Sequence, residues 1–273
     1  MRLAFFGDVV GKAGRKVLDQ HLAHIRRDLS LDFVVVNAEN AAGGFGITEA
    51  VANDIFSYGA DCITLGNHSW DQRDALTYIT REDRLLRPNN YPPGVEAPGR
   101  GANLFTLSDG RRVAVISTLG RLYMDSLDDP FQAVERDLNA MPLGVVADAV
   151  IVDVHAEATS EKMAMGHFCD GRASLVVGTH THVPTGDAQI LPGNTAYQTD
   201  AGMCGDYDSV IGMGKENAVK RFATRLPTER LTPAEGPGTM CGVFVETDDR
   251  TGLATRVEPV RVGGRLKEII PEV

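Results

Sequence analysis

Five short apolar runs, each followed at once by side chains that can bind a metal, constrain most strongly how this chain can fold. The runs cover residues 3–6, 33–36, 62–65, 149–154 and 175–177. Each is nearly continuous in Val, Ile, Leu or Phe rather than alternating, which is typical of strands covered on both faces. Stretches with helical spacing lie between them. The alternation of strand, polar loop and helix predicts an α/β fold.

Four stretches are candidate helices. They cover residues 15–29, 48–58, 131–141 and 160–169. The first carries apolar side chains mostly three or four positions apart, and the second begins with Thr48 and Glu49, the composition of a helix start. Near the C-terminus, residues 239–246 and 253–262 flank a polar turn and predict a β-hairpin. Because no long linker interrupts the chain, we expect one domain over residues 1–273, with a mixed sheet or two stacked sheets.

Composition narrows the possible partners. The 273 residues include 27 basic and 37 acidic side chains, a formal charge of −10 that opposes general attraction to nucleic acid or to an anionic membrane. A small phosphate ester remains a possible ligand, because one local cation site can overcome a diffuse negative field. The four cysteines form no C-x-x-C pair. No apolar stretch approaches the roughly 20 residues of a membrane span, so we expect a cytoplasmic protein.

Seven side chains that follow the apolar runs form the candidate site. They are Asp8, Glu39, Asn40, Asn67, His155, His180 and His182. Ligands of open α/β sheets gather beyond the carboxyl ends of the strands, so these side chains should converge on one crevice. Carboxylate, amide and imidazole ligands together suit Mn, Fe or Zn. Seven ligands exceed one tetrahedral shell, which predicts two ions that share a bridging carboxylate, with Glu39 as the best candidate for the bridge.

Details of this set remain open in the sequence. His180 and His182 are two residues apart, so in an extended segment both rings would point to the same side. Asn40 is either a ligand or a residue that orients Glu39. Several polar residues after His155 could shape the pocket, although helix capping explains two of them, Thr159 and Ser160, equally well. The others are Glu157 and Lys162.

The set resembles that of the calcineurin-like metallophosphoesterases, in which similar motifs follow successive strands. The matching segments here are Gly7-Asp8-Val9-Val10, Asn37-Ala38-Glu39-Asn40, Gly66-Asn67-His68-Ser69, His155 and Gly178-Thr179-His180-Thr181-His182. Two positions depart from that pattern, because Val10 stands where a histidine ligand is usual and Glu39-Asn40 replaces the usual bridging aspartate. These departures are similar to those of a narrower group, the YmdB-like phosphodiesterases. That group also shares the strings from His155 to Lys162, from Gly178 to Thr185 and from Tyr207 to Met213.

The resemblance implies a four-layer αββα sandwich of the metallophosphoesterase type. It also implies a dinuclear centre of iron or manganese, with zinc as a further possibility, and activity on phosphodiesters that include 2′,3′-cyclic nucleotides. By motif matching, Asp8, Glu39, Asn40 and His182 would hold the first ion, and Glu39, Asn67, His155 and His180 the second. His68 would be the proton donor, because it directly follows Asn67 and need not bind a metal itself.

Two other functions use the same residues. A phosphomonoesterase or broad nucleotidase would need the same ions, and a nucleotide-sensing regulatory protein could keep the site with slow turnover. The glycine-rich stretch 202–214 is a candidate substrate or oligomer loop, and we expect a homo-oligomer.

Overall fold

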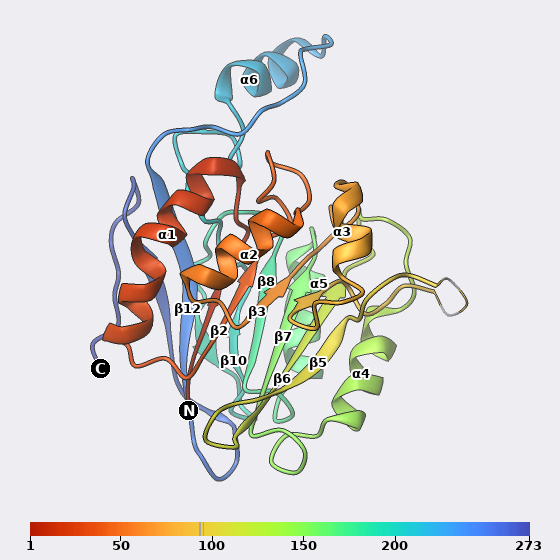
Figure 1. Cartoon of the computed structure of the whole chain (residues 1–273), viewed down its shortest axis with the longest axis vertical. Coiled ribbons are helices and arrows are strands. Elements are labelled where there is room, and N and C mark those ends of the chain that lie inside the picture. Colours follow the sequence, from red (N-terminus) through yellow and green to blue (C-terminus); the bar gives the residue numbers. More distant parts are fainter. Residues whose placement is uncertain (93, 95) are drawn as a thin grey trace.

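Two β-sheets stacked face to face form the centre of the molecule (Figure 1). The computed structural model describes residues 1–92, 94 and 96–273. The first sheet has the order β11-β12-β1-β2-β3-β4, with β13 paired to β12. Its strands are β1 (Arg2–Phe6), β2 (Phe33–Asn37), β3 (Cys62–Thr64), β4 (Leu85–Leu86), β11 (Gly205–Asp206), β12 (Gly238–Thr247) and β13 (Ala254–Val262).

The second sheet has the order β5-β6-β7-β8-β10-β9. Its strands are β5 (Ala102–Thr106), β6 (Arg112–Leu119), β7 (Ala149–His155), β8 (Leu175–Thr179), β9 (Gln189–Ile190) and β10 (Ala196–Gln198). β1, β2 and β3 pair in parallel, as do β6, β7 and β8, so within each sheet these strands end at the same edge. The predicted hairpin is confirmed, because β12 and β13 pair antiparallel.

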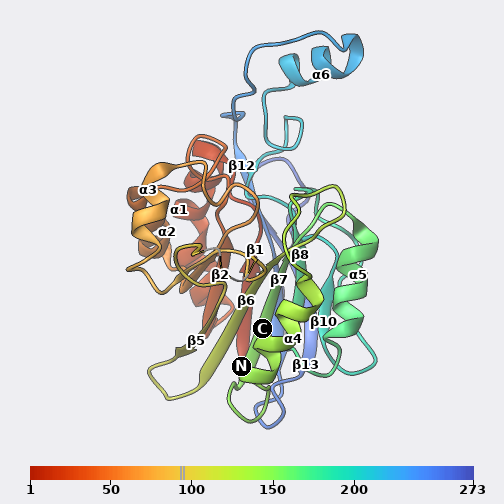
Figure 2. The same ribbon diagram turned by 90° about the vertical axis from the view of Figure 1, so that its right-hand side faces the viewer.

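Helices cover the outer face of both sheets (Figure 2). α1 (Gly11–Asp28), α2 (Glu49–Tyr58) and α3 (Arg73–Tyr78) lie on the first sheet, whereas α4 (Pro130–Ala140) and α5 (Thr159–Phe168) lie on the second. α6 (Lys215–Thr224) projects away from the sandwich. The predicted start of α2 is confirmed, because the Thr48 side chain accepts a hydrogen bond from Val51 N. α1 begins four residues earlier than predicted, within Gly-Lys-Ala-Gly, which has no apolar periodicity.

Three separate apolar cores confirm the four-layer αββα sandwich. In β1, Leu3 and Phe5 point into the core between the sheets, whereas Ala4 and Phe6 join the core beneath the first group of helices. A third core packs the outer face of the second sheet against α4 and α5. The strands read as continuous apolar runs because both of their faces are buried.

Two further features concern the cysteines and the helices. All four cysteines are buried as free thiols. Among residues 1–92, 94 and 96–273, no helix is both long and apolar enough to cross a membrane.

Candidate metal centre

The predicted site residues lie at the carboxyl ends of five strands from both sheets. Asp8 follows β1, Glu39 and Asn40 follow β2, Asn67 and His68 follow β3, His155 ends β7, and His180 and His182 follow β8. Asp8, Glu39, Asn40, His155 and His182 are buried, whereas His68 and His180 are partly exposed. Parallel pairing brings the strand ends of each sheet to one edge, and contacts of Glu39 and Asn67 with His155 show that the edges of the two sheets meet.

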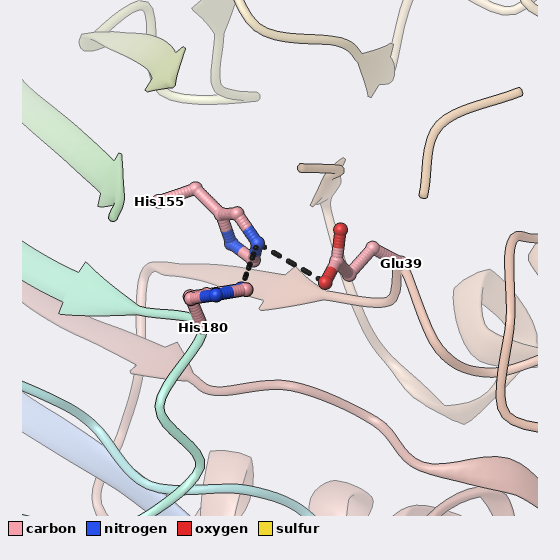
Figure 3. A group of neighbouring side chains, drawn as sticks. All are labelled: Glu39, His155 and His180. Atoms are coloured by element: carbon pink, nitrogen blue, oxygen red, sulfur yellow. Dashed lines mark hydrogen bonds and ion pairs between the residues drawn. The ribbon is translucent and has the colours of Figure 1, made fainter. Parts of the chain in front are cut away.

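Four of the residues meet around the Nε2 atom of His155. This atom lies 3.0 Å from Glu39 Oε1, 3.0 Å from Asn67 Oδ1 and 3.1 Å from His180 Nδ1. Figure 3 shows Glu39 and His180 directed at the same edge of the His155 ring. Ligand atoms of Glu39, His155 and His180 all lie within 4.8 Å of one another, close enough to hold one metal ion.

Asp8 connects this cluster to His182. Its Oδ1 atom lies 3.8 Å from His182 Nε2 and 3.9 Å from His155 Nδ1, and its Oδ2 atom accepts a hydrogen bond of 3.2 Å from the backbone N–H of His180. The backbone carbonyl of Asn40 accepts hydrogen bonds from the backbone N–H groups of Gly11 and Gly44, which fixes the position of this residue. No side-chain hydrogen bond links Asn40 to the other six residues within the described part of the chain.

Gly66 leaves the room that the cluster occupies. A Cβ atom at this position would lie 2.3 Å from His155 Nε2 and 2.5 Å from Glu39 Oε2. Real Cβ atoms essentially never approach other atoms so closely. The absence of a side chain at Gly66 therefore allows the two groups to meet.

The second ring nitrogen of each histidine has its own partner. His155 Nδ1 lies 2.9 Å from Thr179 Oγ1, His180 Nε2 lies 3.2 Å from Glu157 Oε2, and His182 Nδ1 lies 2.8 Å from the carbonyl of Ile211. Such contacts fix the tautomer and orientation of a ligating imidazole and leave the other nitrogen free to bind. Ile211 belongs to the stretch 202–214, so this loop supports the site. Glu157, which the sequence offered as a residue that could shape the pocket, contacts His180.

Burial and close charges shift the pKa values of these groups in opposite directions. Burial raises the pKa of Asp8 to about 6, although attraction between its carboxylate and His182 acts to lower this pKa. Burial opposes ionisation of Glu39, but attraction to His155 prevails and lowers the pKa of Glu39 to about 2. Burial likewise opposes protonation of His155, yet attraction to Glu39 raises its pKa to about 9. Burial and repulsion from His155 lower the pKa of His180 to about 3, so this ring stays neutral near pH 7.

The residues present fit a bound cation. Asn40 Nδ2 donates to the carbonyl of Gly44, but Asn40 Oδ1 is buried and has no hydrogen-bond partner among the described residues. Such an orphaned acceptor is costly in a protein interior and rare unless a cation or water satisfies it. Buried carboxylates, an amide oxygen and imidazoles at contact distance are the donor set that Mn, Fe and Zn accept.

The segment around His180 and His182 corrects one prediction. β8 ends at Thr179, and both histidines adopt left-handed backbone conformations with φ values of 91° and 65°. The expectation that an extended segment directs both rings to the same side is therefore wrong. His180 faces His155 through Nδ1, whereas His182 faces Asp8 through Nε2. The turn thus distributes the two rings over two neighbouring positions, beside His155 and beside Asp8.

A buried ion pair holds this turn, and the sequence gives no signal for it. Asp200 accepts hydrogen bonds from the backbone N–H and the hydroxyl of Thr181, at 3.1 and 2.5 Å. Lys162, fully buried in α5, donates to the same carboxylate at 2.8 Å. Lys162 therefore supports the histidine turn from beneath, through its ion pair with Asp200. The N-cap position of α5 is Ala158, and no side chain makes a capping hydrogen bond there. Capping by Thr159 or Ser160 is therefore not observed.

His68 lies at the edge of this cluster. Its backbone N–H donates to Glu39 Oε2 at 3.0 Å, and its ring Nδ1 lies 2.8 Å from Asp71 Oδ2. The ring packs edge-on against Phe45, at 5.2 Å between centroids. The His68 side chain is 28% exposed, so it adjoins both the buried groups and solvent.

The molecule is a two-sheet sandwich with helices on both outer faces, and its strand ends carry carboxylate, amide and imidazole groups. This fold and this site together are those of the metallophosphoesterase class of enzymes. Comparison with known proteins agrees. The family model described as YmdB-like protein matches residues 4–260. A 2′,3′-cyclic-nucleotide 2′-phosphodiesterase of Bacillus subtilis (strain 168) is 42% identical over 268 residues, which cover 96% of this chain and 97% of that relative.

Two further proteins show the same similarity. A putative phosphatase/phosphodiesterase of Mycoplasma genitalium is 34% identical, with 96% of this chain and 93% of that relative covered. The crystal structure of a phosphatase from Mycoplasma pneumoniae has a TM-score of 0.88 at 33% identity and covers 96% of this chain and 93% of that chain. The chain therefore belongs to the YmdB-like family, which confirms the resemblance seen in the sequence, and it is a phosphoesterase.

Proposed function

We propose that this protein is a dinuclear metal-dependent phosphodiesterase that hydrolyses small phosphodiesters, with 2′,3′-cyclic nucleotides as substrates. The convergence of Glu39, Asn67 and His180 on His155 Nε2 carries the proposal. The name of the Bacillus subtilis relative supports the substrate class. The net charge of −10 favours a small substrate over bulk nucleic acid.

Two sets of ligands are proposed, with Glu39 common to both. Glu39, Asn67, His155 and His180 would hold one ion, and Asp8, Glu39, Asn40 and His182 would hold the other. The contacts around His155 support the first set, while the contact between Asp8 and His182 and the unpaired oxygen of Asn40 support the second. Manganese and iron are the metals we favour, and zinc accepts the same ligands.

When bound, two such ions would lower the pKa of a water molecule, whose proton passes to solvent, and would neutralise the charge of the phosphoryl oxygens, so that hydroxide is available near neutral pH. The residues of the chain position the reacting groups. Asp71 engages Nδ1 of His68, which leaves Nε2 as the ring atom that can give a proton to the departing ribose oxygen. A new oxygen–phosphorus bond forms, the bond to that ribose oxygen breaks, and the proton from His68 completes the leaving hydroxyl.

Substitution of His68 tests the proposal. Reconstituted His68→Ala should keep its metal content and lose turnover of 2′,3′-cyclic AMP by about 10² to 10⁴-fold, the usual contribution of a general acid. His167→Ala is the matched control, because His167 is an exposed histidine of α5. Normal turnover of His68→Ala at normal metal content would remove His68 from this role.

Product analysis separates the proposal from its rivals. The protein should hydrolyse 2′,3′-cyclic AMP and a linear diester faster than a phosphomonoester. A higher rate with the monoester would favour a phosphomonoesterase, and tight nucleotide binding with turnover far too slow for metabolism would favour a sensor.

We also propose that the protein self-associates and resides in the cytoplasm. α6 and the segment after it expose Val219, Phe222 and Leu226, and Phe222 is 77% exposed. An exposed apolar patch of this kind supports a protein contact. The molecular mass in solution, with Phe222→Ser as the comparison, tests this part.

A further inference from the structure

Asp153 is a fully buried carboxylate that joins the two sheets directly beneath the metal centre. It lies in β7 within an otherwise apolar run. Three donors reach it: Asn37 Nδ2 at 3.0 Å, Thr64 Oγ1 at 2.5 Å and Thr179 Oγ1 at 2.7 Å. Asn37 and Thr64 belong to the first sheet, whereas Thr179 belongs to the second. A buried carboxylate needs such donors, and here they come from strands whose ends carry the proposed ligands.

Thr179 connects this carboxylate to a proposed ligand. His155 and Thr179 are register partners in β7 and β8, and His155 Nδ1 lies 2.9 Å from Thr179 Oγ1. The threonine hydroxyl has one proton, which it donates to Asp153 Oδ1. Thr179 Oγ1 must therefore accept from His155 Nδ1–H. In the neutral ring that a metal ion would bind, the lone pair of the imidazole is then on Nε2, the atom around which Glu39 and His180 gather.

We propose that Thr179 and Asp153 are positioning residues that set the tautomer and the orientation of His155 so that Nε2 is presented to a metal ion. The inference rests on the proposed metal site and is independent of the substrate. Groups that hold the second nitrogen of a ligating histidine typically change metal affinity by 10- to 100-fold when they are removed.

Thr64 offers a matched control for a purely structural role. Its hydroxyl donates to the same carboxylate of Asp153, and it has no other side-chain hydrogen bond among the described residues. Thr64→Val and Thr179→Val each remove one buried hydroxyl that donates to Asp153, with nearly unchanged side-chain shape. Only the second also removes the acceptor of His155.

The test is a calorimetric titration of metal-free protein with Mn²⁺ alone, using wild type, Thr179→Val, Thr179→Ser and Thr64→Val. We expect Thr179→Val to weaken binding of one ion by about 10- to 100-fold and Thr179→Ser to restore it to within a few-fold of wild type. Thr64→Val should bind Mn²⁺ as wild type does, even where its thermal stability falls as far as that of Thr179→Val. Equal Mn²⁺ affinity of Thr179→Val and wild type would overturn the inference, whereas a wild type that binds no Mn²⁺ would overturn the proposed function.

A second measurement needs no variant and so does not depend on the folding of Thr179→Val. Nitrogen-15 spectra of the histidine rings in wild type loaded with Zn²⁺ report which nitrogen carries the proton. We expect the His155 proton on Nδ1, with slow exchange against solvent. A proton on Nε2 of His155 would contradict the inference, because the hydrogen-bond chain through Thr179 would then run in the opposite direction.

Discussion

The floor and the rim of the metal centre differ in how their side chains are held. The floor consists of the buried groups Asp8, Glu39, Asp153, His155, Lys162, Thr179 and Asp200. The rim consists of His68, Asp71, Glu157 and His180, whose side chains are 28%, 41%, 49% and 22% exposed. Floor residues contact one another through hydrogen bonds and ion pairs shielded from water, whereas rim residues also meet solvent.

This difference separates two tasks. Shielded polar contacts are strong and fix geometry, but the same shielding makes an unpaired partner costly. Half-exposed groups can exchange protons with water while a neighbour orients them. Changes to the floor should therefore alter stability and metal binding, and changes to His68 and Asp71 on the rim should alter turnover.

The largest expected effect is on the floor, at Lys162. Lys162→Met leaves Asp200 buried without its cation, which should lower the free energy of unfolding by about 3–5 kcal/mol. Lys215→Met is the matched control, because the pair of Lys215 with Asp208 is solvent-exposed and should contribute at most about 1 kcal/mol. Urea unfolding of both variants measures the contrast. Equal losses would show that burial does not distinguish the two ion pairs.

Gly66→Ala should break the floor at its centre. The new Cβ would force His155 and Glu39 apart, and a displacement of about 1 Å can cost on the order of 100-fold in activity. We expect a comparable fall in Mn²⁺ affinity, measured by calorimetry on metal-free protein. Gly186→Ala is the control, since a Cβ there meets no atom within 4 Å. Unchanged Mn²⁺ binding by Gly66→Ala would contradict the arrangement of the floor.

The smallest expected effect is on the rim, at Asp71. Asp71→Ala removes the hydrogen bond that orients His68, and because the pair is half-exposed we expect a loss of about 10-fold in kcat with unchanged metal content. Asp19→Ala, an exposed carboxylate in α1, is the control. Steady-state kinetics with 2′,3′-cyclic AMP provides the measurement. A loss of metal from Asp71→Ala would place Asp71 with the floor and erase the distinction.

Much of the fold was predictable because its central strands are buried on both faces. β1, β2, β3, β7 and β8 appear in the sequence as apolar runs, and α2 carries its own capping residue. β9 and β11 were not predicted, because each has only two residues and no recognisable pattern. α6 was missed as well, since it buries only Ala218 and shows no apolar stripe toward the sandwich.

The candidate site was predictable where ligand-type residues lie at or just beyond the ends of strands, as His155 and Asp8 do. The contacts of the buried groups that support the site, Asp153 and Lys162, were not predictable. Asp153 lies 116 positions from its partner Asn37, and Lys162 lies 38 positions from Asp200, so no local spacing reveals either contact. The left-handed turn at His180 and His182, which Asp200 bonds through Thr181, could not be deduced, because even histidine adopts such a conformation only in a minority of cases.

Anomalous diffraction from a crystal of the protein loaded with Mn²⁺ tests the central claim most directly. The account predicts two manganese peaks, one bound by His155 and His180 and the other by Asp8 and His182, with Glu39 contacting both. A single peak in the pocket, or manganese held only by other residues, would contradict it.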